Sequence, residues 1–229
     1  MPNTSPPIFS PALLQQLDIN GPRYTSYPTA DRFHEGFDAD AYAGTLAARR
    51  ELSEHNAAAP LSLYVHIPFC ESVCYYCACN KVITRHHERA ADYLHALDTE
   101  IELHRVALGG PQAVSQLHFG GGSPTFLSDA ELAGLMASLG RAFAFVPDAE
   151  MSIEVDPRTV TPHRLAHCRS LGFNRISFGV QDFDPQVQIA VHRVQPYESV
   201  RVLMVAAREL GFKSINADLI YGLPRQTPQ

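Results

Sequence analysis

Four cysteines stand close together in the stretch Cys70-Glu-Ser-Val-Cys74-Tyr-Tyr-Cys77-Ala-Cys79. The first three have the spacing C-x3-C-x2-C, and such short spacers let a single loop fold back and present its thiols to one metal centre. Thiolates are soft ligands that suit iron-sulfur clusters. Three thiols hold three corners of a four-iron cluster and leave the last iron open to a small molecule. The spacing therefore predicts a reactive cluster at Cys70, Cys74 and Cys77.

A structural zinc site is the main alternative for this stretch. Such sites take four ligands, usually as two well-separated pairs, and the sequence has no second pair. Cys79 is a candidate fourth ligand, although a C-x-C step would crowd one tetrahedral centre. Five cysteines, four of them in this stretch, fit a reduced compartment and a metal site better than a disulfide framework. The cluster is favoured over zinc or disulfides.

The elements that position this stretch alternate regularly along the chain. Strands are expected at 63–67, 114–119, 151–155, 175–179 and 214–220, and helices at 88–108, 129–145, 162–171 and 197–210. Ser128 with Glu131 forms a capping-box pattern, Thr161-Pro162 begins a helix, and Gly172 and Gly211 end helices. Such alternation predicts parallel strands covered by helices, as in a whole or partial β/α barrel. The near-repeat of Leu171-Gly-Phe-Asn-Arg-Ile176 at 210–215 marks equivalent helix-to-strand connections.

Polar residues follow the expected strands, where the working groups of parallel β/α barrels gather. Gly120-Gly-Gly-Ser-Pro124 follows the second strand, and glycines let a backbone approach a ligand closely, although a plain tight turn is as good a reading. Glu154 lies at the end of the third strand. Its carboxylate suits the two hydroxyls of a ribose, and the alternative is a helix-capping or solvated acid. The other candidates are Gln181, Arg193, Asp218 and, on strands facing the barrel mouth, His66 and His118. His86, His87, His95 and His104 are expected to be solvated.

Several stretches of the sequence match motifs of known protein families. The cysteine spacing after His66-Ile-Pro-Phe-Cys70, with Tyr76 before the last thiol, resembles the radical S-adenosylmethionine (SAM) superfamily. The longer match Tyr64-Val-His-Ile-Pro-Phe-Cys70, the additional Cys79 and Gly21-Pro-Arg-Tyr-Thr-Ser-Tyr-Pro-Thr29 resemble the oxygen-independent coproporphyrinogen III oxidases, or coproporphyrinogen dehydrogenases. The likeness runs from about Gly21 to the last residue.

This resemblance implies roles for individual residues. Cys70, Cys74 and Cys77 would ligate a [4Fe-4S] cluster, and Tyr64, Gly121 and Glu154 would contact the SAM bound to it. A second SAM would be contacted by Tyr76, Gly122, Ser123, Gln181, Arg193 and Asp218. The family often has phenylalanine in place of Tyr76 and threonine in place of Ser123. Cys79 is retained in the family without being a ligand, so Cys79 and His66 are the candidates for a catalytic role.

The implied activity is the oxidative decarboxylation of coproporphyrinogen III to protoporphyrinogen IX in haem biosynthesis. It would use two SAM molecules and a cytosolic electron donor, and begin with a 5'-deoxyadenosyl radical. One alternative is a non-catalytic haem-trafficking chaperone of the same superfamily, which the 21–29 segment and Cys79 disfavour. A simple iron-sulfur or zinc structural protein is the other.

The resemblance also predicts the domain organisation. Residues 1–59 would form an N-terminal arm whose segment 21–29 lies near the substrate, with Arg23 available for a propionate and Tyr24 and Tyr27 for stacking. Residues 60–229 would form a radical SAM β/α barrel. Five strands are visible where the family has six and a helical C-terminal domain, so we expect an N-terminal portion of a longer protein, with an incomplete barrel.

Bulk composition excludes several classes. The 229 residues are 45% hydrophobic, enough for a sizeable core, and the net charge of -6 argues against nucleic acid or an anionic membrane as a partner. No apolar run approaches the roughly 18 residues of a membrane span, and the first residues lack a signal-peptide pattern. We expect a cytoplasmic monomer.

Overall fold

The computed structural model describes residues 10–18, 29–55 and 58–227. It divides into two compact units, Met1–Thr45 and Leu46–Gln229, each described here by itself. The first contains the short helix α1 (Pro11–Leu17), which Ser10 caps, and the 3-10 turn η1 (Ala30–Arg32). Helix α2 (Ala39–Glu54) begins in the first unit and ends in the second. Of the segment 21–29, all but Thr29 lies outside the described residues, including Arg23, Tyr24 and Tyr27.

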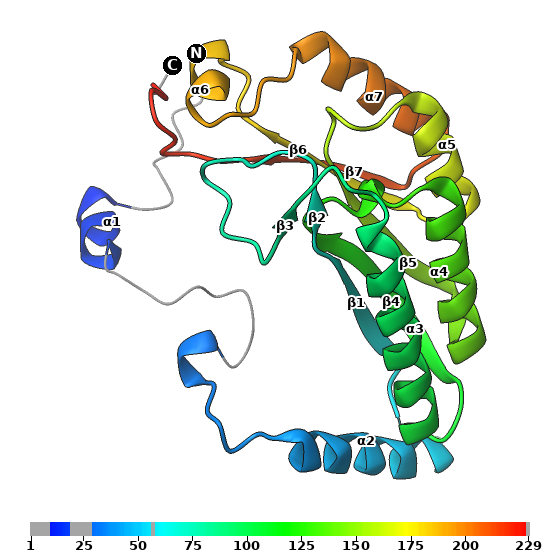
Figure 1. Ribbon diagram of the computed structural model, residues 1–229. Helices are drawn as coiled ribbons and strands as arrows, with labels where there is room; N and C mark the ends of the chain where they lie inside the picture. Colours follow the sequence, from blue (N-terminus) through cyan, green and yellow to red (C-terminus); the bar gives the residue numbers. More distant parts are fainter. Residues whose placement is uncertain (1–9, 19–28, 56–57, 228–229) are drawn as a thin grey trace, which may run out of the picture. The chain divides into compact units, whose positions relative to one another are not determined.

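The second unit is built on a five-stranded sheet (Figure 1). Its strands are all parallel, in the order β1 (Leu61–Ile67), β4 (Gln112–Gly121), β5 (Phe143–Val155), β6 (Arg175–Gln181) and β7 (Ser214–Leu219). Helices α3 (Arg89–Ala107), α4 (Asp129–Ala142), α5 (Pro162–Ser170) and α7 (Tyr197–Glu209) lie along one face of the sheet. This confirms the predicted alternation and the partial β/α barrel. None of the described helices is long and apolar enough to cross a membrane.

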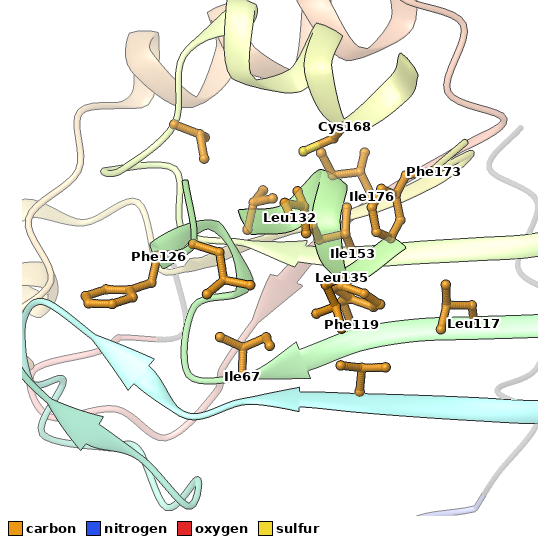
Figure 2. Close-up of a cluster of buried hydrophobic side chains, with 14 of the residues drawn as sticks. Ile67, Leu117, Phe119, Phe126, Leu132, Leu135, Ile153, Cys168, Phe173 and Ile176 are labelled. Atoms are coloured by element: carbon orange, nitrogen blue, oxygen red, sulfur yellow. The ribbon is translucent and has the colours of Figure 1, made fainter. Parts of the chain in front are cut away.

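The core lies between the sheet and this helix layer (Figure 2). Successive side chains of a strand point to opposite faces. In β6, Ile176 and Phe178 are almost fully buried, whereas Arg175, Ser177 and Gly179 are only partly so. Leu132 and Leu135 of α4 pack in the same apolar cluster. The opposite face of the sheet is therefore free to carry polar groups.

The sequence signals for helix ends are confirmed. The Ser128 side chain accepts from the Glu131 N–H while the Glu131 carboxylate accepts from the Ser128 N–H, which closes a capping box at α4. Thr161 caps α5 with proline at its first turn. Gly172 and Gly211 have φ angles of +101° and +77°, which only glycine adopts readily after a helix. The two near-repeats are equivalent, since Ile176 pairs with Ile215 in the sheet.

Three features differ from the sequence prediction. The helix expected at 129–145 ends at Ala142, because Phe143 is extended (φ -134°, ψ 151°) and already begins β5. A two-residue parallel pair, β2 (Phe69–Cys70) and β3 (Val82–Ile83), was not foreseen, nor was helix α6 (Pro185–Ala190), which Asp184 caps. These elements are too short for their period to show in a sequence.

Candidate functional site

A pocket of about 320 Å³ lies at the carboxyl ends of the strands in the second unit. The cysteine stretch, the glycine-rich loop after β4 and the ends of β5, β6 and β7 all contribute to its lining. The predicted site residues that line it are Cys70, Cys74, Tyr76, Cys77, Cys79, Gly121, Gly122, Ser123, Glu154, Gln181, Arg193 and Asp218. Tyr64, His66 and His118 do not line it. Residues as far apart in sequence as Cys70 and Asp218 are thus brought to one place.

Backbone hydrogen bonds fix the start of the cysteine stretch against the glycine-rich loop. The N–H of Gly122 donates to the Ile67 carbonyl at 2.8 Å, and that of Ser123 to the Phe69 carbonyl at 2.8 Å. On the other side, the Thr84 N–H donates to the Cys70 carbonyl at 2.9 Å within the β2–β3 pair. Hydrogen bonds on both sides therefore hold the backbone at Cys70 in place.

The segment after α6 holds the middle of the cysteine stretch. The Tyr75 N–H donates to the Val191 carbonyl at 3.1 Å, and Nδ1 of His192 lies 2.8 Å from the Val73 carbonyl. A carbonyl only accepts, so this Nδ1 carries the proton. The rings of Tyr75 and His192 stack with centroids 5.3 Å apart, and His192 has a φ of +56°, a strained angle for a non-glycine residue.

The thiols differ in their exposure. Cys74 is buried, Cys70 and Cys77 are half-buried, and Cys79 is exposed. Burial raises the pKa of the Cys70 thiol to about 11, although a hydrogen bond with Ser123 acts to lower it. Burial also raises the pKa of Cys79, and a hydrogen bond with Cys77 adds to this.

Charged groups surround Cys74. Nη1 of Arg193 lies 3.3 Å from its sulfur and Nη2 of Arg158 lies 3.6 Å from it. Asp156 pairs with both arginines. Burial would raise the pKa of Asp156, but its hydrogen bond with Arg158 and the two positive charges outweigh this and hold the pKa below its usual value. Positive charge is thus built into the pocket wall.

Glu154 belongs to a chain of polar side chains on the face opposite the helices. Nε2 of His118 lies 3.0 Å from a Glu154 oxygen, and the Tyr64 ring stacks on the His118 ring with centroids 5.7 Å apart. The Tyr64 hydroxyl lies 3.0 Å from Nδ1 of His66, whose Nε2 lies 2.8 Å from the Asn80 carbonyl. Tyr64 and His66 therefore connect β1 to the end of the cysteine stretch. His118 orients Glu154 at the edge of the pocket.

The strands β6 and β7 supply the remaining polar groups. Nη2 of Arg193 donates to the Gly179 carbonyl at 2.7 Å, and the Ser177 hydroxyl donates to Asp218 at 2.8 Å. A Cβ atom on Gly179 would lie 2.9 Å from Arg193 Nη2, so this glycine makes room for the guanidinium. Gln181 has a φ of +70°, a second strained position beside the pocket.

Comparison with known proteins identifies the family of the chain that forms this pocket. A family model for the radical SAM superfamily matches residues 64–229. The chain belongs to this superfamily. Membership implies a [4Fe-4S] cluster and SAM as cofactors.

Within this superfamily, the chain is similar in sequence to one group of curated relatives, the oxygen-independent coproporphyrinogen III oxidases. The chain is 51% identical over 218 residues to the oxygen-independent coproporphyrinogen III oxidase of Escherichia coli, covering 95% of this chain and 46% of that protein. The Pseudomonas aeruginosa oxidase is also 51% identical over 218 residues, covering 94% and 46%, and that of Helicobacter pylori is 46% identical over 215 residues, covering 93% and 46%. The chain spans about half the length of these relatives.

A solved structure agrees with this likeness. Coproporphyrinogen III oxidase from E. coli, a radical SAM enzyme, superimposes with a TM-score of 0.82 at 50% identity. The match covers 90% of this chain and 46% of that one. The parallel sheet and its helix layer are therefore those of a radical SAM barrel.

The residues in the pocket fit a radical SAM cluster. Among the described residues, no three Cys, His, Asp or Glu side chains converge on a point where one metal ion could be held. A cluster instead takes each thiolate on a different iron atom, so its ligands stand apart around a shared space. Cys70, Cys74 and Cys77 fit such a cluster, since all three line one pocket. The guanidinium groups at Cys74 complement the negative charge of thiolates and sulfide.

Sequence reasoning missed Asp156 and Arg158 as parts of the site. Both follow Glu154 just after the end of β5. The sequence signal that could have revealed them is an acid and a base two residues apart directly after a strand. His87 is exposed, as expected, and it also makes two contacts: its Nε2 lies 2.7 Å from a Glu131 oxygen and its ring stacks on Phe126. The contact with Glu131 joins the start of α3 to the cap of α4.

Proposed function

We propose that the whole protein, of which these residues form a part, catalyses the oxygen-independent oxidative decarboxylation of coproporphyrinogen III to protoporphyrinogen IX, in haem biosynthesis. The observation that carries this proposal is the identity of 51% with the E. coli oxidase over 95% of the chain. The pocket supports it, because the residues that the cluster and SAM would need, apart from Tyr64, line one space.

We infer that Cys70, Cys74 and Cys77 bind the cluster, which with SAM supplies a 5'-deoxyadenosyl radical. The other lining groups are assigned to SAM on their positions. Glu154, oriented by His118, offers a carboxylate to the ribose hydroxyls, and Gly121 offers backbone to the SAM bound to the cluster. Tyr64 is assigned to the same SAM through its stacking on His118.

A second SAM molecule is part of the proposal. Its contacts would be Tyr76, Gly122, Ser123, Gln181, Arg193 and Asp218, all of which line the pocket. Arg193 offers a guanidinium to a carboxylate, and Asp218, held by Ser177, offers an acceptor. Cys79 and His66 are the residues proposed to assist the reaction directly. The protein would act as a cytoplasmic monomer that receives electrons from a cytosolic donor.

Anaerobic assay of the full-length protein with SAM, a reductant and coproporphyrinogen III tests this function. We expect formation of 5'-deoxyadenosine and of the divinyl product. The Cys74→Ser variant should lose the cluster and both products, whereas Cys168→Ser, outside the pocket, should retain them. Stable haem binding with no vinyl product would reject the proposal in favour of a haem chaperone. A cluster whose electron paramagnetic resonance (EPR) spectrum is unchanged by SAM would indicate a structural iron-sulfur protein.

A further inference from the structure

Cys74 is the buried thiol of the cysteine stretch, and two guanidinium groups face it. Arg193 Nη1 lies 3.3 Å from the sulfur and Arg158 Nη2 lies 3.6 Å from it. The Cys74 residue is 8% exposed, so these contacts are largely shielded from water. Arg193 already has a proposed role toward SAM. Arg158 has none.

Asp156 fixes the orientation of Arg158. Its Oδ1 atom lies 3.0 Å from Nε and its Oδ2 atom lies 2.7 Å from Nη2, which is a two-pronged pairing. Oδ1 also accepts from the Arg158 backbone N–H at 3.0 Å. The Asp156 side chain is only 9% exposed and that of Arg158 is 21% exposed. A guanidinium held in this way loses little freedom when it donates to the sulfur.

The charges of this group do not cancel. Oδ2 of Asp156 also lies 3.3 Å from Arg193 Nη1, so one carboxylate is shared by two cations. Two positive charges and one negative charge leave a net positive charge beside Cys74. The third partner of Arg158 is the His192 carbonyl, at 3.5 Å from Nη1. The end of β5 and the segment after α6 thus cooperate to direct positive charge at one thiol.

We propose that Arg158 is a positioning residue that, held by Asp156, donates a hydrogen bond to the Cys74 sulfur and raises the reduction potential of the cluster bound there. This rests on the proposed function, since it needs the cluster. An added electron makes the cluster more negative, and nearby positive charge and hydrogen bonds to a ligand sulfur stabilise that reduced state. Arg158 thereby makes the cluster easier for the electron donor to reduce.

The test is a redox titration of the anaerobically reconstituted full-length protein, followed by EPR spectroscopy. Wild type is compared with Arg158→Gln, which removes the charge, and Arg158→Lys, which keeps the charge but cannot form the two-pronged pair with Asp156. The matched control is Arg201→Gln, because Arg201 also pairs with an acid but lies on the exposed surface of α7, away from the pocket. We expect the potential of Arg158→Gln to shift to more negative values at wild-type iron content, with Arg158→Lys between the two and Arg201→Gln unchanged.

The outcomes separate this inference from the proposed function. A cluster in wild type whose potential is the same in Arg158→Gln overturns the inference alone. A wild-type protein that takes up no cluster overturns both. If Arg158→Gln fails to assemble the cluster, Arg158→Lys decides: a more negative potential supports the role of Arg158 and an unchanged one overturns it.

Discussion

The carbonyl oxygen of Phe69 lies 2.7 Å from the place that a Cβ atom would take on Gly122. Real Cβ atoms do not approach a backbone oxygen so closely, and the Pro68 carbonyl oxygen lies 2.8 Å from the same place. The glycine-rich loop therefore packs backbone to backbone against the base of the cysteine stretch. This packing alone requires a glycine at position 122, whether or not the loop also contacts a ligand.

We predict that Gly122→Ala destabilises the protein by about 1–3 kcal/mol, the usual cost of overpacking a tight site. The added methyl group must push the two loops apart and weaken the hydrogen bond from the Gly122 N–H to the Ile67 carbonyl. Urea unfolding measures the change in free energy, and iron content reports the effect on cluster assembly.

Gly134→Ala is the matched control. A Cβ atom on Gly134 meets nothing within 4 Å, and the residue lies inside α4. Alanine should therefore stabilise this helix by up to about 1 kcal/mol. If Gly122→Ala were as stable as wild type, the packing would not be the reason for a glycine at this position.

The sheet and its helices could be predicted because each repeats a local pattern. Leu171 to Ile176 and the near-repeat at 210–215 carry the same helix-to-strand signal, and they occupy equivalent places in β6 and β7. Most of the expected candidates at the strand ends lie together for a related reason, since parallel strands end at one edge of the sheet. Of the candidates, Tyr64 and His66 on β1 and His118 on β4 lie outside the pocket lining.

The surroundings of Cys74 could not be predicted in this way. Arg193 is 119 residues away from it and Arg158 is 84 residues away. No local pattern reports which charged side chain of a distant loop will face a given thiol. The end of α4 was misplaced for a different reason: Phe143 and Phe145 continue the apolar pattern of the helix while the backbone at Phe143 is already extended.

We predict that Asn174→Ala costs about 1–3 kcal/mol of stability, because it removes the partners of polar backbone groups. The side chain of Asn174 accepts from the Met151 N–H at 3.0 Å and donates to the Ala149 carbonyl at 2.8 Å, which ties the loop before β6 to β5. Lys213, the equivalent residue of the near-repeat, is exposed. Lys213→Ala should change the free energy of unfolding by less than about 0.5 kcal/mol. Equal effects of the two substitutions in urea unfolding would contradict this account.

Glu131 should make the stability depend on pH. Burial acts to raise its pKa, but hydrogen bonds from Ser128 and the contact with His87 outweigh this, so the pKa is lowered in the folded protein. A group whose pKa is lower when folded stabilises the protein fully above its ordinary pKa, about 4.3 for glutamate, and loses this contribution as the pH falls through the lowered value.

We therefore expect Glu131→Gln to be less stable than wild type by about 0.5–1 kcal/mol at pH 7, the size of a charge interaction at a helix start. The difference should shrink as the pH is lowered below about 4. Unfolding by urea at a series of pH values measures it. Glu209→Gln, at an exposed position near the end of α7, is the control and should show a difference below about 0.5 kcal/mol throughout. A constant difference between Glu131→Gln and wild type at every pH would exclude the charge as its cause.

Cys168 should resist modification in the folded protein. It is 0% exposed on α5, and burial raises the pKa of its thiol to about 11. Iodoacetamide reacts only with the thiolate. At pH 8 the Cys168 thiol is protonated and also inaccessible to the reagent, so it should react slowly. We expect its alkylation to be at least about 100-fold slower in the native protein than in urea, from the difference between a pKa near 8.5 and the raised value. Mass spectrometry of peptides gives both rates, and the exposed Cys79 shows in the same sample that the reagent is active. Alkylation of native Cys168 at the rate found in urea would mean that α5 does not pack on the sheet as the structure shows.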